Sequence, residues 1–275
     1  MALTITSKWD SSSASSRLVT VESSGHWYDA EGRSAHVIIG KNGKERNTTV
    51  ADARKMGLLP SVTSVQGILH KEQLVSWRIE QAIMSALTLP KEENETLEDY
   101  ARRVVKDSKE STTKAAEHGT KMHTEMENIL LGRAVSRDET LAPYIKTFSE
   151  WAEKNVEKTY WCEKGLVGAG YAGRCDAYVK LRGTGDAIID LKNRKVNPKY
   201  DPFYDTDCAQ LWAYRNASEN PKASCVSVVL ASNDATKLMT KVWDEDELYQ
   251  AGIAFCAMQK VWAWVKGYTP PGMKL

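Results

Sequence analysis

The sequence predicts an α/β fold, a central mixed sheet flanked by helices, and three observations support this prediction. Apolar residues recur at helical spacing through residues 60–158. The apolar period then changes to two over residues 159–192, which is typical of short strands. A helical segment, a β-branched strand and a closing helix follow, and such alternation is typical of layered α/β proteins.

Length and composition are those of an ordinary globular protein. The 275 residues, 42% of them hydrophobic, suffice for one large domain, which we assign to residues 25–275. The formal net charge of +1 gives no overall basic field, so a nucleic-acid path would have to be a local basic groove. The five cysteines include no Cys-x-x-Cys pair, which argues against a disulfide framework, a zinc ribbon and an iron–sulfur cluster.

The N-terminal part predicts a leader and a small accessory hairpin. Residues 1–24 are rich in Ser and Thr, and we expect them to form a loosely ordered leader. They lack the hydrophobic segment of a secretory signal, and no apolar run approaches the length of a membrane span, so we expect a soluble cytoplasmic protein without a membrane partner. Within residues 25–50 the run Val37-Ile38-Ile39 precedes Asn42-Gly43, a hairpin turn signal, although an ordered loop is the alternative.

Residues 60–158 predict a helical block of four helices before the sheet. The first begins at Ser61, the second is capped by Thr96, and the third runs from Glu117 to Leu131. Each stripe of apolar residues on these helices is expected to lie in the core, and the block is expected to arch over the active site. The stripes are Trp77, Ile79, Ile83 and Leu87; Leu97, Tyr100, Ala101, Val104 and Val105; and, on the fourth helix, Leu141, Tyr144, Ile145, Phe148, Trp151 and Ala152.

Residues 159–275 predict the αβ core. Three short strands are expected at 159–167, 171–181 and 186–192, and the last two form a hairpin around a Gly-rich turn. The elements that follow are a helix at 206–217, a buried strand at 224–230, an edge strand at 236–243 and a closing helix with the stripe Leu248, Ala251, Phe255, Met258, Trp262 and Val265.

The second strand of the hairpin ends in the triplet Asp190-Leu191-Lys192. Because side chains alternate along a strand, Asp190 and Lys192 share one face while Leu191 points into the core. Asp176 on the neighbouring strand brings a second carboxylate to the same end of the hairpin, which we expect to face the helical block. Two hard oxygen donors and one ammonium group are what metal-assisted hydrolysis of a phosphodiester requires.

An exposed salt bridge at a strand end is the alternative interpretation of this triplet. A second Asp-x-Lys occurs at 107–109, in a stretch patterned as helix, where residues two apart do not face each other. That copy is interpreted as solvated surface. The copy at Asp190 differs because the apolar run Ala-Ile-Ile precedes it and Gly173-x-x-Asp176 lies upstream.

Four motifs together resemble a known family. Gly119-Thr120-x-x-His123, Gly173-x-x-Asp176, Asp190-Leu191-Lys192 and Gln210-x-x-x-Tyr214, in this order, are similar to the RecB-like branch of the PD-(D/E)XK nuclease superfamily. Within that branch the resemblance is to phage-encoded exonucleases, the mitochondrial genome maintenance exonuclease and CRISPR-associated relatives. It covers roughly residues 60–231. No single motif is specific, but their order and their strand and helix contexts agree. The resemblance implies a restriction-endonuclease-like core.

The resemblance also implies roles for individual residues. His123, Asp176 and Asp190 would be ligands of one or two Mg²⁺ or Mn²⁺ ions, with the backbone carbonyl of Leu191 completing the shell. Lys192 would orient or help deprotonate the attacking water. The remaining matched residues are Gln210 and Tyr214, beside the lysine or the DNA backbone, and Glu163, an accessory acidic group. Without the resemblance, the favoured interpretation of His123 is an ordinary core or surface histidine, as it is for His118.

This sequence departs from the family pattern at two positions. Cys175 stands where the superfamily name has Pro, and Asn193 stands where Thr is frequent after the lysine, which could alter a phosphate contact. The spacing of the cysteines differs from that of the iron–sulfur members, so no such cluster is expected.

The resemblance implies a metal-dependent DNA exonuclease. It would hydrolyse phosphodiester bonds at single-stranded DNA ends in phage or bacterial DNA processing, repair or recombination, in the cytoplasm of a bacterial host if the gene is phage-encoded. Two alternatives remain: an endonuclease of the same fold, and a non-catalytic DNA-binding module. Basic residues that could hold the DNA backbone, or simply form solvated faces, are Arg102, Arg103, Lys106, Lys114, Lys121, Arg194, Lys195 and Lys199.

Overall fold

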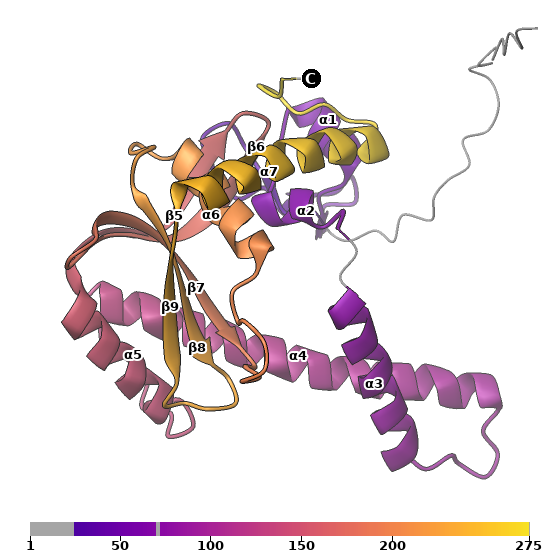
Figure 1. The fold of residues 1–275 in the computed structure, drawn as a ribbon. Helices are drawn as coiled ribbons and strands as arrows, with labels where there is room; N and C mark the ends of the chain where they lie inside the picture. The colour runs from indigo at the N-terminus through magenta and orange to yellow at the C-terminus, as the bar shows by residue number, and fades with distance from the viewer. Residues whose placement is uncertain (1–24, 70–71, 275) are drawn as a thin grey trace, which may run out of the picture.

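The computed structural model describes residues 25–69 and 72–274, and its centre is a five-stranded mixed sheet (Figure 1). The strand order follows the chain, β5-β6-β7-β8-β9. β7 and β8 are parallel, and every other neighbouring pair is antiparallel. The strands are β5 (Val156–Gly168), β6 (Tyr171–Leu181), β7 (Gly185–Arg194), β8 (Ser224–Ala231) and β9 (Leu238–Trp243). The predicted α/β class and central mixed sheet are therefore confirmed.

Helices cover both faces of this sheet. α4 (Leu97–Leu130) and α5 (Ala142–Asn155) lie on one face, and α6 (Asp205–Ala217) and α7 (Glu245–Lys266) lie on the other (Figure 1). The crossover between the parallel strands β7 and β8 is α6, as parallel pairs require. Each face has its own apolar core, and successive strand residues alternate between the two: Ile188 belongs to the α6–α7 core and Ile189 to the α4–α5 core.

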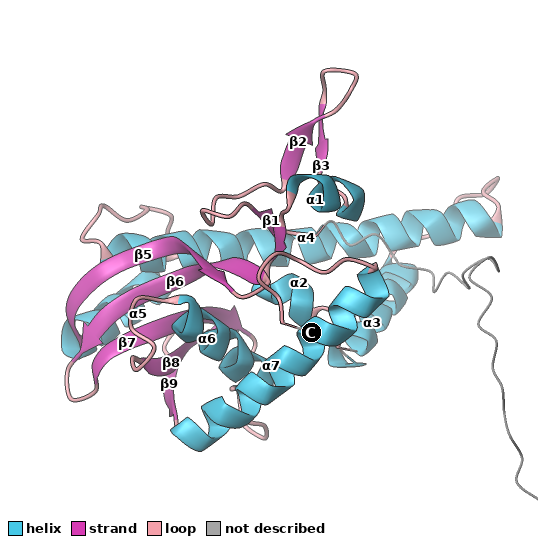
Figure 2. Ribbon diagram, turned by 90° about the horizontal axis from the view of Figure 1, so that it is seen from above, coloured by secondary structure: helices cyan, strands magenta, loops and turns pink. Residues whose placement is uncertain are grey.

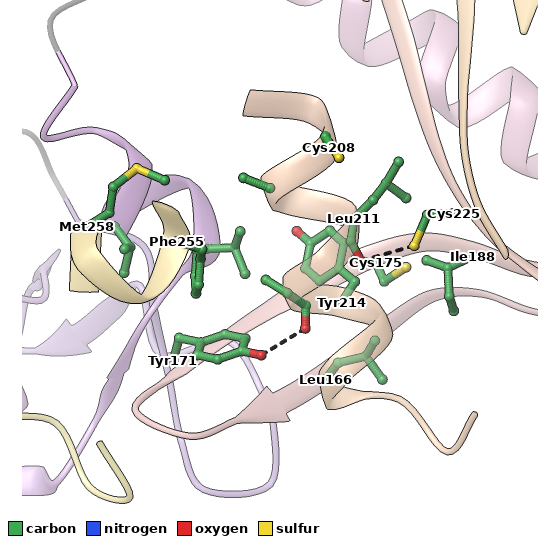
Figure 3. Packing of buried hydrophobic residues seen from close by; sticks show 14 of the residues in the cluster. Leu166, Tyr171, Cys175, Ile188, Cys208, Leu211, Tyr214, Cys225, Phe255 and Met258 are labelled. Atoms are coloured by element: carbon green, nitrogen blue, oxygen red, sulfur yellow. Dashed lines mark hydrogen bonds between the residues drawn. The ribbon is translucent and has the colours of Figure 1, made fainter. Parts of the chain in front are cut away.

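The core beneath α6 and α7 fixes the position of α6 over the sheet (Figure 3). Leu211 and Tyr214 of α6 belong to the same cluster as the strand residues Cys175 and Ile188, and Phe255 of α7 stacks edge-on against Tyr171. The Tyr171 hydroxyl donates to the carbonyl of Ala213, 2.9 Å away, so this buried phenol is satisfied. The stripe predicted for the closing helix faces this core except for Val265; its members in the core are Leu248, Ala251, Phe255, Met258 and Trp262.

Residues 25–69 form a small layer beside the sheet. The predicted hairpin is confirmed: β2 (Val37–Ile39) pairs with β3 (Glu45–Asn47) around Asn42-Gly43. β1 (Trp27–Tyr28) pairs with β4 (Leu59–Pro60), which the sequence did not predict. Two short helices complete the layer, α1 (Val50–Met56) and α2 (Val62–Gln66). The leader assigned to residues 1–24 lies outside the described residues.

The helices before the sheet differ from the prediction in two ways. The second and third predicted helices are one continuous helix, α4, because residues 105–118 contain neither Gly nor Pro and nothing interrupts the backbone ladder. The first predicted helix is divided into α2 and α3 (Glu72–Thr88). Its stripe is not core: the α3 side chains Ile79, Ile83 and Leu87 are exposed. Among the described elements, α3 packs mainly against the part of α4 that projects beyond the sheet (Figure 1).

Part of the α4 stripe is exposed for the same reason, since Leu97 and Val105 lie on the projecting part. The stripe of α5 is buried as predicted, with Phe148 fully covered. Within residues 25–69 and 72–274, no helix combines the length and hydropathy needed to span a bilayer.

Candidate metal centre

The sheet forks between β6 and β7. Their antiparallel ladder ends at the pair Ala177 and Ile189 (Figure 2). Beyond it β6 continues to pair with β5 and makes one bridge, from Ala172 to Ser61, while β7 continues to pair with β8. At the fork, Oδ2 of Asp176 accepts the backbone N–H of Leu191 at 2.6 Å. A side-chain carboxylate therefore takes the place of the next ladder bond, and groups from both faces of the sheet can meet at this point.

Glu163 faces the fork from β5 in an unusual backbone conformation. Its φ is +52°, and it is the one residue other than glycine with positive φ among those the structure describes. The register pairs Cys162 with Ala177 and Lys164 with Cys175, which puts Glu163 opposite Asp176. In a regular strand Cys162 and Leu166, four residues apart, would face the same side of the sheet. Cys162 instead packs toward the α4–α5 core and Leu166 toward the α6–α7 core, so the alternation of side chains is interrupted around Glu163. For a residue other than glycine, a left-handed backbone conformation is less stable by roughly 1–2 kcal/mol. Strain of this kind is concentrated at functional sites.

Three side chains from different elements converge beside the fork. Nε2 of His123, on α4, lies 2.8 Å from Oε1 of Glu163 and 3.5 Å from Oδ1 of Asp176. One potential ligand atom from each residue lies within 4.8 Å of the others, close enough to hold one metal ion. All three side chains are partly buried, with 32%, 22% and 11% of their surfaces exposed, respectively. We call this set the trio.

The trio is electrostatically coupled. Burial lowers the pKa of His123, but the hydrogen bond to Glu163 and the charge of Asp176 outweigh it and raise that pKa to about 9. At neutral pH the imidazole is therefore protonated when no metal is bound. A divalent ion that binds Nε2 must displace this proton, so metal binding should release a proton.

A second group of side chains lies on the α6 side of the fork. Nζ of Lys192 donates to Oδ1 of Asp190 and, more weakly at 3.4 Å, to Oε1 of Gln210. Nε2 of Gln210 in turn donates to the hydroxyl of Tyr214 at 3.3 Å. Asp190, Lys192, Gln210 and Tyr214 therefore form one connected chain, and α6 fixes the position of the ammonium group.

Asp190 has an incomplete set of partners. The residue is completely buried, and its Oδ2 has no hydrogen-bond partner among the described residues. Burial raises the pKa of this carboxyl, although the Lys192 ammonium opposes the shift. Burial lowers the pKa of Lys192, but the charges of Asp190 and Asp176 outweigh it and raise that pKa. A buried carboxylate oxygen without a donor is what a bound cation would satisfy.

Gly173 explains how α6 comes so close to the strand that bears Asp176. A Cβ on Gly173 would lie 2.9 Å from the Tyr214 ring and 3.2 Å from its hydroxyl oxygen. Only glycine therefore allows Tyr214 to pack directly over β6 beside Gln210. The glycine of Gly173-x-x-Asp176 has a steric role in the site.

The predicted ligands are only partly brought together. His123 and Asp176 are in the trio, but its third member is Glu163, predicted as an accessory group, and not Asp190. Asp190 lies across the fork, paired with Lys192. The contact seen at Leu191 is made by its N–H with Asp176.

All three predicted DNA-contacting arginines already have carboxylate partners. Arg102 pairs with Glu98 and Asp99, and Arg103 pairs with Glu95 at 2.6 Å. Arg194 pairs with Asp207 and lies over the Tyr204 ring. Lys121 and Lys195 are exposed, as are Lys106 and Lys199, and the Lys114 side chain lies outside the described part of the chain.

One basic residue of the site was missed from the sequence. Nε of Arg174, on β6, lies 3.6 Å from Oε2 of Glu163, and the Arg174 side chain is 57% exposed. The sequence could have indicated Arg174, because it lies two residues before Asp176 and the two side chains of a regular strand at this spacing point to the same side of the sheet.

A scan of protein-family models and a search of curated protein sequences find no match to this chain. Two carboxylates and one imidazole, with a buried carboxylate oxygen nearby that lacks a partner, form a donor set that fits a hard or borderline divalent metal ion.

Proposed function

We propose that this chain is a metal-dependent nuclease of the PD-(D/E)XK type, with a restriction-endonuclease-like core, that removes nucleotides from single-stranded DNA ends. The observation that supports the proposal best is the convergence of His123, Glu163 and Asp176 from three separate elements. The strained backbone of Glu163 adds to it, since a structural salt bridge does not need a left-handed residue within a strand.

The trio would hold a Mg²⁺ or Mn²⁺ ion, and Asp190 would contribute through the oxygen that lacks a partner. Carboxylates suit Mg²⁺, and the imidazole makes Mn²⁺ equally suitable. When bound, such an ion lowers the pKa of a water molecule and offsets negative charge on the phosphate under attack.

Lys192 would act beside the metal ligands. Its ammonium group is held by Asp190 and Gln210, and its side chain is 24% exposed, so it can reach a molecule in the site. A cation held in this way would orient the attacking water or stabilise charge that develops on the phosphate oxygens. The Asp190 carboxyl, buried and close to the ammonium, would keep Lys192 protonated.

The preference for free ends is proposed from the helices before the sheet. The helix that bears His123, α4, extends beyond the sheet, and α3 packs against this projecting half (Figure 1). We propose that they form an arch that guides a single strand toward the trio. A closed circular strand would then be a poorer substrate than its linear form.

The test is degradation of end-labelled single-stranded DNA with Mg²⁺, with Mn²⁺ and with a chelator. Asp176→Asn and Lys192→Ala should each lower the rate at least about 1000-fold, because several kcal/mol of transition-state stabilisation would be lost. Asp246→Asn, an exposed aspartate on α7, is the matched control and should leave the rate unchanged.

Three results would contradict parts of the proposal. Unchanged degradation by both site variants would remove the proposed centre. An unmodified protein that binds DNA but degrades none with either metal would be a binding module. Equal rates on circular and linear strands would make the protein an endonuclease.

A further inference from the structure

A polar trench runs beside the trio. It has a volume of about 790 Å³ and lies between one face of α4 and the strands β5 and β6. His123 and Glu163 form its inner end, and Arg174 lies on the strand wall. Gly119 and Thr120 line the helix wall one turn before His123. The trench therefore leads from solvent to the potential metal ligands.

Gly119 lies at a position where the fold does not require glycine. It is in the interior of α4, where glycine is less favourable than alanine by about 1 kcal/mol. A Cβ built on Gly119 would meet no atom within 4 Å, so packing does not exclude a side chain there. Because Gly119 has no side chain, the trench stays open beside the α4 backbone. This suggests that a ligand approaches the backbone at this point.

Arg174 is the one lysine or arginine that lines the trench in the described part of the chain. Its ion pair with Glu163, at 3.6 Å, is too long for a good hydrogen bond, and the described residues accept no hydrogen bond from its guanidinium. Other arginines of the same fold, such as Arg103 and Arg215, make short two-pronged pairs with a carboxylate. The Arg174 donors therefore remain available in the trench, where their fork geometry suits a phosphate.

We propose that the trench is a phosphate-binding subsite for a nucleic-acid strand, in which the Arg174 guanidinium binds a backbone phosphate and Gly119 provides the space for it. The phosphate would be a neighbour of the one that lies against the trio, because Arg174 contacts Glu163, a member of the trio. This inference rests on the function proposed above and adds a specific contact to the substrate. Arg174 is a binding residue in this scheme and takes no part in bond cleavage.

The first test measures binding of a fluorescein-labelled oligothymidylate by anisotropy over a range of KCl concentrations, with Ca²⁺ in place of the catalytic metal. Arg174→Ala should weaken binding about tenfold or more, since a hydrogen bond between charged groups is lost. It should also reduce the slope of log K against log salt by about 0.7, the contribution of one phosphate contact to a single strand. Arg182→Ala is the matched control, because Arg182 is exposed in the turn after the same strand. Its binding should match that of the unmodified protein.

The second test fills the space at Gly119. Gly119→Leu should weaken oligothymidylate binding about tenfold or more. The melting temperature of this variant should stay the same or rise, because leucine favours a helix more than glycine does. Ala257→Leu is the control for added bulk, since Ala257 is exposed on α7, away from the trench. A Gly119→Leu variant that binds the strand normally would overturn the subsite.

Mn²⁺ binding, followed by electron paramagnetic resonance, separates this inference from the nuclease proposal. Both trench variants should bind Mn²⁺ as the unmodified protein does. If Arg174→Ala loses Mn²⁺ and DNA affinity together, Arg174 positions Glu163 and the phosphate subsite is rejected. If the Arg174→Ala and Arg182→Ala variants bind DNA equally well, or the unmodified protein binds none, the subsite is also rejected. If the binding results are as expected but no DNA is cleaved, the subsite stands and the nuclease function fails.

Discussion

The two halves of α4 have the same helical geometry but different surroundings. The C-terminal half lies on the sheet, where Met122 and Met126 are almost completely buried and His123 reaches the trio. The N-terminal half projects beyond the sheet, where its described neighbours are α3 and the loop that follows it, and Leu97 is 75% exposed. The comparison shows that the helical period fixes which residues share a face, whereas burial of that face depends on a partner elsewhere in the chain.

The largest expected difference between the two halves is in stability. Met122→Ala should lower the free energy of unfolding by about 2–5 kcal/mol, because it opens a cavity in a closed core. Val105→Ala in the projecting half should change it by less than about 0.5 kcal/mol, since Val105 is exposed. Urea denaturation measures both. Equal costs would mean that the projecting half is covered in solution.

The next difference concerns metal binding. His123→Ala should weaken Mn²⁺ binding by at least about 10–100-fold, or about 1.4–2.7 kcal/mol. Loss of a residue that only positions a metal ligand already has an effect of this size, and loss of a ligand should have at least the same effect. Arg102→Ala, on the projecting half of the same helix, should not change Mn²⁺ affinity, because its contacts are with Glu98 and Asp99. Calorimetric titration distinguishes the two variants. An unaffected His123→Ala protein would remove the imidazole from the ligand set.

A smaller effect tests the strained strand residue that faces this half of α4. Glu163→Gly should be more stable than Glu163→Ala by about 1 kcal/mol, because only alanine is strained at positive φ. The same pair of substitutions at Val167, later in β5 where the ladder with β6 is regular, should show the opposite order, since glycine weakens a regular strand by about 0.5–1 kcal/mol. The order is read from urea midpoints. The same order at both positions would contradict a left-handed Glu163.

The smallest effect belongs to the loop that joins α3 to the projecting half. The ion pair with Arg103 lowers the pKa of Glu95 to about 2, so the pair stabilises the fold above the unfolded pKa of about 4.5. That stabilisation is lost as the pH falls from 4.5 toward 2, because the carboxyl becomes protonated. The melting temperature of the protein should therefore slightly exceed that of Glu95→Gln at pH 6, and the two should converge in acid. A gap that widens on acidification would contradict the assignment.

The sequence predicted the sheet closely because its strands have unambiguous patterns. The bounds 171–181 predicted for β6 are those observed, and alternation around Leu191 put Asp190 and Lys192 on the same face. Helix α1 was missed although a capping box at Thr49 and Asp52 begins it and Gly57 ends it. These signals were present, and a search for caps alone would have found the helix.

Other features could not be predicted from the sequence. Ile79 and Leu87 are exposed because none of the residues that the structure describes covers that side of α3, and periodicity does not reveal whether a helix face has a partner. The conformation of Glu163 is equally hidden, because glutamate is not a residue that favours positive φ. For that reason the trio could not be assembled from alternation, which assigns Glu163 to the opposite face. The metal ion and the substrate remain predictions.

The fork in the sheet also has a consequence for self-association. Where β6 and β7 separate, each strand presents backbone donors and acceptors to the gap, and unpaired edges of this kind recruit strands from other molecules. Here the Asp176 carboxylate occupies one donor, and Ser61 pairs with Ala172 on the opened part of β6. The start of α2 therefore covers part of the opened edge of β6, which leaves less of that edge available to strands of other molecules.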